Sequence, residues 1–432
     1  MGNKSLLSPS PCLSGLSFLS SASPPGDRRR GIAARGRNAS PPHASAAAPS
    51  SNSSNLHRTP PPHLLLPPPA PSTLPNPLRR RPFRRHRRPL PLPPPLYTQS
   101  CPFHRNAWNC LRNGRLPVAA LSWSPSRCGG VVPRVDPAAF LASARGRRIG
   151  LVGDSLSENL VVALLCALRA GDAGARKWKR RGAWRGGYFP REDVVVAYHR
   201  AVLLAKCTWQ PVENSKLHKD GIKGTYRVHV DIPSDDWVNI TKFYDVLIFN
   251  TGHWWGPDKF PRETPLVFYK GGKPIEPPLG IFDGLKVVLK SMASYIEREV
   301  PGKTLKLWRT QSPRHFDGGE WDHNGSCVSH RLLEEHELDS WFDPRFGGVN
   351  KETRLVNSAI QEALVHTNIQ LLNLTHMSEF RADAHPAIWL GKKDAVAVWG
   401  QDCMHWCLPG VPDTWVDILA ARISHYFKQG HG

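Results

Sequence analysis

Ile149-Gly150-Leu151-Val152-Gly153-Asp154-Ser155 is the stretch that decides the fold. Its apolar run predicts a buried β-strand, and a helix pattern starts directly after Ser155. A strand that turns sharply into a helix exposes the side chain at the turn, and the helix start offers free N–H groups and a positive dipole end to an oxyanion. Ser155 is therefore a candidate nucleophile. Serine also caps helices, so this stretch alone supports a helix cap equally well.

A second polar block lies far downstream and reads Asp402-Cys403-Met404-His405. Asp402 and His405 are three positions apart, so a single turn can place both side chains on one face. A catalytic triad is defined by the geometry of Ser, Asp and His and not by their order in the chain. Together with Ser155, these two residues complete a candidate triad.

The other apolar segments predict alternating strands and helices. Strands are expected at residues 148–152, 193–204, 226–232, 244–249, 303–308, 369–374 and 395–399. Helices are expected at residues 157–168, 282–300, 351–367 and 413–427. This alternation indicates an α/β fold in which helices cover both faces of a central, mostly parallel sheet. Residues 147–430 are predicted to form this domain.

Several polar residues follow the ends of predicted strands. Ligands of open α/β sheets bind outside the carboxyl ends of the strands. The candidates for oxyanion or substrate contacts at this edge are Gly153, Asp154, Asn250, His253, Arg309, His315, Arg381, Asp383 and His385. Arg309 and His315 have two interpretations, since either side chain could contact a substrate or pair with Asp383.

The first hundred residues differ in composition from the rest of the 432-residue chain. They hold 22 of the 42 prolines, and thirteen arginines and Lys4 against the single acid Asp27, so only +9 of the total charge of +22 belongs to the remainder. This composition predicts that residues 1–96 are disordered. The arginine clusters are interpreted as a solvated linker, because few aromatic residues are interleaved with them as a nucleic-acid site would require. No apolar stretch has the length of about eighteen residues that predicts a transmembrane helix.

Nine cysteines are distributed over the sequence. None has the CxxC spacing of a zinc cluster, so disulfides in an oxidising compartment are preferred to a metal site, although Cys403 and Cys407 around His405 could ligate a metal. Residues 97–146 are predicted to be a small, disulfide-stapled lead-in, and Cys166 is expected to be a core residue. Sequons at Asn239, Asn324 and Asn373 favour the same compartment.

Together these motifs resemble one family. Gly153-Asp154-Ser155 is similar to the first block of the GDSL/SGNH hydrolases, and residues 402–410 resemble the DxxH block of the plant trichome birefringence-like proteins. The same family is matched, in order and over about residues 100–428, by segments 110–115, 250–255, 309–316 and 381–386. The resemblance implies a PC-esterase domain with the three-layer sandwich of SGNH hydrolases. It also implies O-acetyltransferase activity on a plant cell-wall polysaccharide, most often xylan, in the Golgi lumen.

The resemblance also implies a role for each candidate residue. Ser155 is implied as the nucleophile, His405 as the base, and Asp402 as the group that orients the base. The backbone N–H of Ser155 and a side chain of the Asn250 loop are implied as the oxyanion hole. The expected partners are a polysaccharide acceptor and an acetyl donor, with acetyl-CoA as a candidate; no cofactor, metal or nucleic acid is expected.

The N-terminal region departs from the family pattern. A membrane anchor is expected from the resemblance, and none is visible in the sequence. The pairing implied by the family is Cys101–Cys207, Cys110–Cys407 and Cys327–Cys403, which leaves Cys128 without a partner.

Two other functions fit the same sequence. An acetyl esterase would use the same triad, because the difference lies in whether water or a sugar hydroxyl reaches the acyl-enzyme. A non-catalytic binder of wall polysaccharide, such as pectin, would use the positive charge and would not need Ser155.

Overall fold

The computed structural model describes residues 95–115, 123, 125, 132–212, 221–391 and 400–430. Three predictions concern residues outside these ranges: the disorder of the N-terminal segment, the state of Cys128, and the strand at residues 395–399.

A seven-stranded sheet forms the centre of the fold, and β1 (Arg148–Gly153) is its middle strand. β1 runs parallel to both of its neighbours, β4 and β7, and β10 and β11 continue the parallel part. β3 and β2 are antiparallel and form the opposite edge. In spatial order the strands are β11 (Gln370–Leu372), β10 (Leu305–Arg309), β7 (Val246–Phe249), β1, β4 (Val194–Arg200), β3 (Arg185–Phe189) and β2 (Arg176–Lys177). The predicted, mostly parallel sheet is confirmed.

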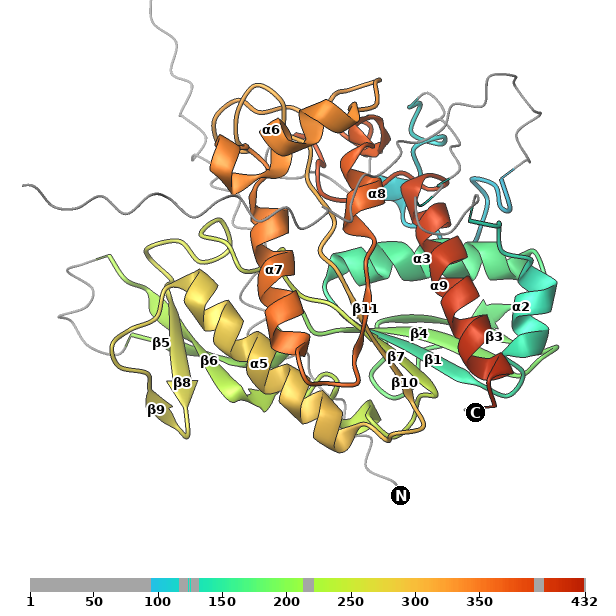
Figure 1. Cartoon of the computed structure of the whole chain (residues 1–432), viewed down its shortest axis with the longest axis horizontal. Coiled ribbons are helices and arrows are strands. Elements are labelled where there is room, and N and C mark those ends of the chain that lie inside the picture. Colours follow the sequence, from blue (N-terminus) through green and yellow to red (C-terminus); the bar gives the residue numbers. More distant parts are fainter. Residues whose placement is uncertain are drawn as a thin grey trace, which may run out of the picture. The chain divides into compact units, whose positions relative to one another are not determined.

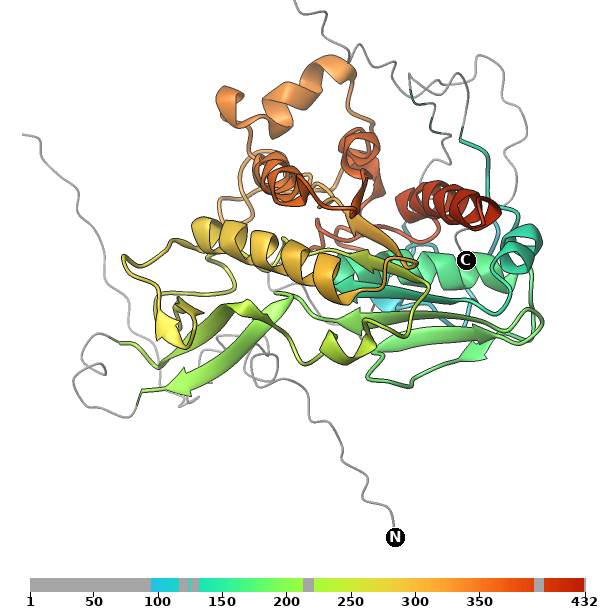
Figure 2. The same cartoon turned by 60° about the horizontal axis from the view of Figure 1, so that its bottom comes forward.

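Helices pack on both faces of this sheet, in two groups that stand apart in Figures 1 and 2. One group contains α2 (Pro137–Ser143), α3 (Ser155–Arg169) and α9 (Val411–Lys428), and the other contains α5 (Ile281–Glu299) and α7 (Glu352–Leu364). Side chains alternate along β1, so that Leu151 joins the apolar core beneath α3 and Val152 joins the core beneath α5. The fold is the three-layer sandwich that the sequence predicted.

A second, four-stranded sheet extends the core beneath α5, and its separate existence was not predicted. Its strands are β5 (Ala205–Pro211), β6 (Gly224–Pro233), β8 (Leu266–Lys270) and β9 (Lys273–Pro274). The predicted strand at 193–204 corresponds to β4, which already ends at Arg200, because the chain turns there and enters β5 of the other sheet. Val228 and Phe268 of the second sheet pack in the same cluster as Leu285 of α5.

Short helices complete the described part of the chain. They are α6 (Leu338–Phe342), α8 (Thr375–Glu379) and the 3₁₀ turns Asn106–Trp108, Val238–Ile240, Glu335–Glu337, Pro344–Phe346 and Ala382–Ala384. Among the described residues, none of the helices has both the length and the apolar character needed to cross a bilayer.

Three disulfides join described cysteines, and one of them differs from the expected pairing. Cys110–Cys407 and Cys327–Cys403 are present as expected. Cys101 bonds to Cys166 and not to Cys207, so the expected Cys101–Cys207 pairing was wrong. Cys166 lies in the core as expected, and it is bonded there. The physical reason is the sheet: Cys101 and Cys166 lie in the core beneath α3, whereas Cys207 lies in the core on the opposite face. Cys207 is itself disulfide-bonded.

Candidate active site

Ser155, His405 and Asp402 form a hydrogen-bonded chain beyond the carboxyl end of β1. Ser155 Oγ lies 2.7 Å from His405 Nε2, and His405 Nδ1 lies 2.8 Å from Asp402 Oδ2. The other oxygen of Asp402 accepts hydrogen bonds from the backbone N–H groups of Met404 and His405. Burial raises the pKa of Asp402, but the charge of His405 and these hydrogen bonds outweigh burial and hold the pKa well below its ordinary value. A nucleophile, a base and a carboxylate that orients the base are thus in contact.

The turn between β1 and α3 leaves the hydroxyl of Ser155 available to His405. Gly153 ends β1 with φ at +152°, and a Cβ at this position would overlap with the side chain and the carbonyl of Asn250. Only glycine therefore allows the two loops to approach this closely. Asp154 caps α3 by accepting a hydrogen bond from the Leu156 N–H at 3.0 Å. The cap is Asp154, so the alternative that Ser155 serves only as a helix cap does not apply.

Asn250 joins the loop after β7 to this turn. Its Nδ2 donates a hydrogen bond to Asp154 Oδ1 at 2.7 Å, and its Oδ1 accepts one from Ser157 Oγ at 2.5 Å. Asn250 is buried, as are Asp154 and Ser157. Ser157 was not singled out from the sequence, because its partner is distant in the chain and nothing local marks it.

The loop that carries His405 is held from several sides. Asn159 of α3 pairs with both backbone groups of Trp406, accepting from its N–H at 3.0 Å and donating to its carbonyl at 3.2 Å. The indole of Trp108, in the lead-in, packs on the imidazole of His405 with 4.9 Å between ring centroids. The Cys110–Cys407 disulfide attaches the lead-in to the same loop. Asn159 and Trp108 were missed from the sequence, although a polar residue within the apolar run of α3 was an available signal.

His315, His385, Arg381 and Asp383 are buried behind this loop. His385 Nδ1 lies 2.7 Å from the carbonyl oxygen of His405, and its Nε2 lies 2.8 Å from His315 Nδ1. Arg381 forms a bidentate ion pair with Asp383, at 2.8 and 3.0 Å. Asp383 therefore pairs with Arg381, and the interpretation that it pairs with Arg309 or His315 is wrong. These side chains contact protein groups, and His385 contacts the backbone of His405.

Arg309 and His253 are also buried. The Arg309 guanidinium lies 4.5 Å from the ring centroid of Trp415, and its nitrogens have no hydrogen-bond partner among the described residues. Burial lowers the pKa of Arg309 to about 10, and the charge of Asp154 opposes this shift. Burial, and then the charges of Arg314, Arg309 and His405, lower the pKa of His253 well below its ordinary value, so His253 is neutral. Its Nδ1 lies 3.3 Å from Gln311 Nε2.

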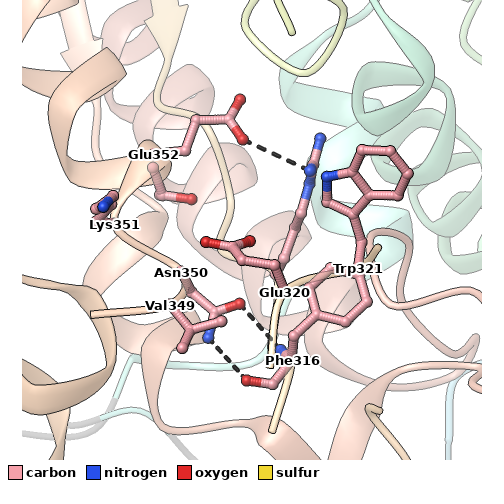
Figure 3. A pocket seen from close by; sticks show the side chains of 9 residues that line it. Phe316, Glu320, Trp321, Val349, Asn350, Lys351 and Glu352 are labelled. Atoms are coloured by element: carbon pink, nitrogen blue, oxygen red, sulfur yellow. Dashed lines mark hydrogen bonds and ion pairs between the residues drawn. The ribbon is translucent and has the colours of Figure 1, made fainter. Parts of the chain in front are cut away.

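A pocket of about 420 Å³ is formed by the segment after β10 and by the start of α7 (Figure 3). Arg314 pairs with Glu352 at 3.5 Å, and Asn350 exchanges hydrogen bonds with the backbone of Phe316. In the view of Figure 3, Glu352 and Lys351 lie on one side, Trp321 lies on the other, and the Glu320 carboxylate lies between them. Arg314, which lines the pocket, and His405 of the triad both lower the pKa of His253 through their charges.

Four tryptophans lie in the loops around this site, and they separate into two pairs by burial. Trp255 and Trp406 are buried and pack in the interior. Trp254 and Trp321 are partly exposed, and Trp321 lines the pocket. Within the described ranges, no cluster of three or more His, Cys, Asp and Glu side chains is arranged to hold a metal ion, and Cys403 and Cys407 are both in disulfides.

The chain has clear relatives among known proteins. Residues 132–422 match the PC-Esterase family, described as a GDSL/SGNH-like acyl-esterase family found in Pmr5 and Cas1p. The chain is 63% identical to trichome birefringence-like 12 of Arabidopsis thaliana over 339 residues, which are 78% of this chain and 83% of the relative. It is 41% identical to trichome birefringence-like 13 of the same plant over 335 residues, 76% of this chain and 79% of the relative. The chain therefore belongs to the trichome birefringence-like proteins within the PC-esterase family.

Proposed function

We propose that the protein is an O-acetyltransferase that moves an acetyl group through an acetyl-Ser155 intermediate onto a hydroxyl of a plant cell-wall polysaccharide, with xylan as the first acceptor to test. One observation carries the proposal: the unbroken hydrogen-bonded chain from Ser155 through His405 to Asp402, at 2.7 and 2.8 Å. Membership of an acyl-esterase family supports the chemistry, because transfer and hydrolysis of an acyl group share the same first step.

In the first half-reaction, His405 Nε2 takes the proton of Ser155 as Oγ attacks the carbonyl carbon of the donor's acetyl group. Asp402, held ionised by its contacts, stabilises the imidazolium that forms. The C–O or C–S bond to the donor then breaks, and His405 returns the proton to the leaving group. The product is acetyl-Ser155 and the free donor alcohol or thiol.

The oxyanion of the tetrahedral intermediate needs N–H donors. The start of α3 provides backbone N–H groups and the positive end of the helix dipole beside Ser155. Asn250 Nδ2 uses one N–H on Asp154, and its second N–H makes no hydrogen bond to a described residue. We assign this second N–H and the Ser155 backbone N–H to the oxyanion, where loss of one donor typically costs about 10²–10³ in rate.

In the second half-reaction, a sugar hydroxyl attacks acetyl-Ser155 while His405 removes its proton. Ser155 Oγ leaves and regains a proton from His405, so the enzyme is restored. We place the acceptor in the pocket of Figure 3, since Trp321 offers an aromatic face and Arg314, Glu320 and Glu352 offer polar groups for sugar hydroxyls. The donor is not defined by these residues, and acetyl-CoA remains the candidate that we would try first.

We also propose that the protein works in the Golgi lumen. The disulfides support an oxidising compartment. The sequon residues Asn239, Asn324 and Asn373 are all exposed, so glycosylation at each of them is sterically possible.

The test uses the full chain secreted from an oxidising host. It is incubated with acetyl-CoA and with deacetylated oligosaccharides of xylan, xyloglucan, mannan and pectin, and the acetyl gain is read by mass spectrometry beside Ser155→Ala. Acetyl gain on one oligosaccharide that is absent in the variant supports the transferase and names its acceptor. Acetyl loss from acetylated oligosaccharides without any gain would replace the transferase by an esterase. If the folded protein gives neither acetyl gain nor acetyl loss, the proposed role of the triad is contradicted.

A further inference from the structure

A second pocket, rich in cations, lies at the opposite end of the central sheet from Ser155. Arg148, the first residue of β1, lines it together with Arg176 and Lys177 of β2 and residues 179–181 after them. Ser155 follows the other end of β1, and the strand between Arg148 and Gly153 is about 17 Å long. The basic pocket is therefore separate from the triad and from the pocket of Figure 3.

The positive charge of this pocket is not balanced. Asp193 is its single lining carboxylate, and Arg148 already pairs with it at 2.9 Å. Lys177, Lys179 and Arg180 are exposed and form no ion pair with any described residue. Cations held this close together repel one another unless an anion lies between them, so the arrangement favours an anionic ligand.

Aromatic rings form part of the wall. Trp178 stacks parallel to Phe243, with 6.1 Å between ring centroids and 11° between planes. The guanidinium of Arg181 lies 4.1 Å from the centroid of Phe243, and that of Arg176 lies 5.1 Å from the centroid of Tyr188. The two guanidinium groups are thus oriented by the rings beneath them, which lowers the entropy that they lose when they bind a carboxylate.

The backbone at Arg181 is also unusual. Arg181 has φ at 55° and Gly182 has φ at 75°, and the Ala183 N–H closes the turn onto the Arg180 carbonyl at 3.0 Å. Positive φ at two consecutive residues is typical of the tight turns that join antiparallel strands. This turn joins β2 to β3 and holds Arg181 in the wall of the pocket.

We propose that this pocket binds an acidic oligosaccharide, that is, a chain of sugars that carry uronic acid carboxylates. Arginine and lysine side chains match the carboxylates, and the exposed parts of the aromatic rings match the apolar faces of sugar rings. The disulfides indicate an oxidising compartment, which argues against a nucleic acid as the ligand. Trp178, Tyr188 and Phe243 are half-buried in the wall, which leaves little apolar surface for insertion into a membrane. The site goes beyond the proposed function, since binding here does not need Ser155.

The experiment follows individual lysines of the pocket. A measurement of total binding would not be specific, because the arginine-rich N-terminal segment also attracts anions. The full chain is treated briefly with an amine-acetylating reagent, with and without a hexamer of galacturonic acid, and the modification of each lysine is quantified by mass spectrometry. We expect the hexamer to reduce labelling of Lys177 and Lys179 at least fivefold and to leave the exposed Lys270 and Lys273 of the second sheet unchanged. Equal labelling of Lys177 and Lys179 with and without the hexamer would overturn the proposal.

Two competitors distinguish an acidic sugar from other ligands. A neutral xylose hexamer should give no protection, and inorganic polyphosphate of equal charge should give at least fivefold weaker protection, because it cannot use the aromatic faces. Equal protection by either would overturn the assignment to an acidic saccharide. Vesicles of anionic phospholipid that protect the same lysines more strongly than the hexamer would replace the saccharide by a membrane.

Matched variants complete the test. The variant Lys177→Ser/Lys179→Ser/Arg180→Ser should raise the Kd for the hexamer at least tenfold, measured by calorimetry at 0.15 M salt. The control variant Lys270→Ser/Lys273→Ser/Lys290→Ser removes the same charge from other exposed positions and should change the Kd less than twofold. An equal effect of both variants would show attraction to overall charge and would contradict a defined site.

Discussion

His315 Nδ1 lies 2.8 Å from His385 Nε2, and both rings are buried behind the loop that carries His405. The outer nitrogens of the pair face backbone carbonyl oxygens: His315 Nε2 lies 2.9 Å from that of Glu379, and His385 Nδ1 lies 2.7 Å from that of His405. A carbonyl only accepts, so each outer nitrogen needs a hydrogen, and the contact between the rings needs a third. Burial keeps both imidazoles neutral, and two neutral rings supply only two hydrogens, so one of the three contacts lacks its hydrogen.

This pair makes the stability of the protein depend on pH. Burial lowers the pKa of His315 to about 4, and burial and then the charge of His315 lower that of His385 well below its ordinary value. In the unfolded chain these two histidines take up protons near pH 6.5, whereas in the folded protein they stay neutral at that pH. The free energy of unfolding therefore falls as the pH drops from about 6.5 to about 4, by up to roughly 1.4 kcal/mol per pH unit for each histidine.

We expect His315→Gln to reduce the slope of the free energy of unfolding against pH by up to roughly 1.4 kcal/mol per pH unit. The reason is that glutamine offers a donor and an acceptor but does not titrate. The measurement is urea unfolding at pH 7, 6 and 5. Asp413 and Asp417, whose pKa burial raises to about 6, titrate in the same window in both proteins and cancel in the comparison. His425→Gln, at an exposed position on α9, is the control and should keep the parent slope. An unchanged slope in His315→Gln would show that the buried pair exchanges protons as the unfolded chain does.

Replacing Asp402 by asparagine should lower kcat by about 10³–10⁴ and leave the fold intact. The amide oxygen still accepts from the backbone N–H groups of Met404 and His405, but the charge that favours the imidazolium is gone and the tautomer of His405 is no longer fixed. Acetyl transfer and the thermal midpoint would be measured together. A loss below tenfold with an unchanged midpoint would remove Asp402 from the proposed mechanism.

Trp108 should position His405 without touching the substrate. Its indole, 1% exposed, packs on the imidazole, so Trp108→Phe would loosen the ring and lower kcat about tenfold with little change in KM. The matched control is Trp237→Phe, another buried tryptophan, which lies in the core on the opposite face of the sheet. Both variants should lower the thermal midpoint, but only the first should lower kcat. Equal kcat values in the two variants would mean that Trp108 serves stability alone.

Trp321 should affect acceptor binding more than chemistry. Removing its ring from the pocket of Figure 3 takes away the aromatic face proposed for the sugar, worth about 1 kcal/mol, so Trp321→Ala should raise the KM for the oligosaccharide about fivefold. The KM for the acetyl donor should stay the same. Trp184→Ala, at an exposed tryptophan on the edge of the sheet, is the control. A change in the donor KM alone would move the donor into this pocket.

The sequence was sufficient for features with a local signature. β1 and the helix after Ser155 follow from an apolar run and a helix pattern, and Asp402 and His405 are close enough in the chain for one turn to bring both to the same face. The order of strands in the sheet and the partners of Asn250 were out of reach, because they depend on contacts between distant segments. Strand β6 illustrates the limit: its apolar alternation predicted a strand, but nothing in it indicated that it pairs in a separate sheet.

The buried polar residues show the same limit from another side. His315, Arg381, Asp383 and His385 were predicted at the carboxyl edge of the sheet, since they follow strands or precede the His405 loop. Whether such a side chain contacts a substrate or other protein groups depends on which segments of the chain pack against it. Here the lead-in contacts two members of the site, because Arg115 donates to the carbonyl of Asp383 at 2.5 Å and Trp108 packs on His405.

The Cys101–Cys166 disulfide can be tested independently of any activity. Trypsin acting on the non-reduced protein should release the peptide of residues 149–169, which contains Cys166 as well as Ser155, joined to the peptide that ends at Arg105. The bond closes a separation of 65 residues, so Cys101→Ala/Cys166→Ala should lower the free energy of unfolding by about 4 kcal/mol in the chain-entropy description. The Cys110–Cys407 bond still attaches the lead-in to the loop that carries His405, so Trp108 should stay on His405 and kcat should change little. A peptide that joins Cys101 to Cys207 would instead place the lead-in against the opposite core and would contradict this arrangement.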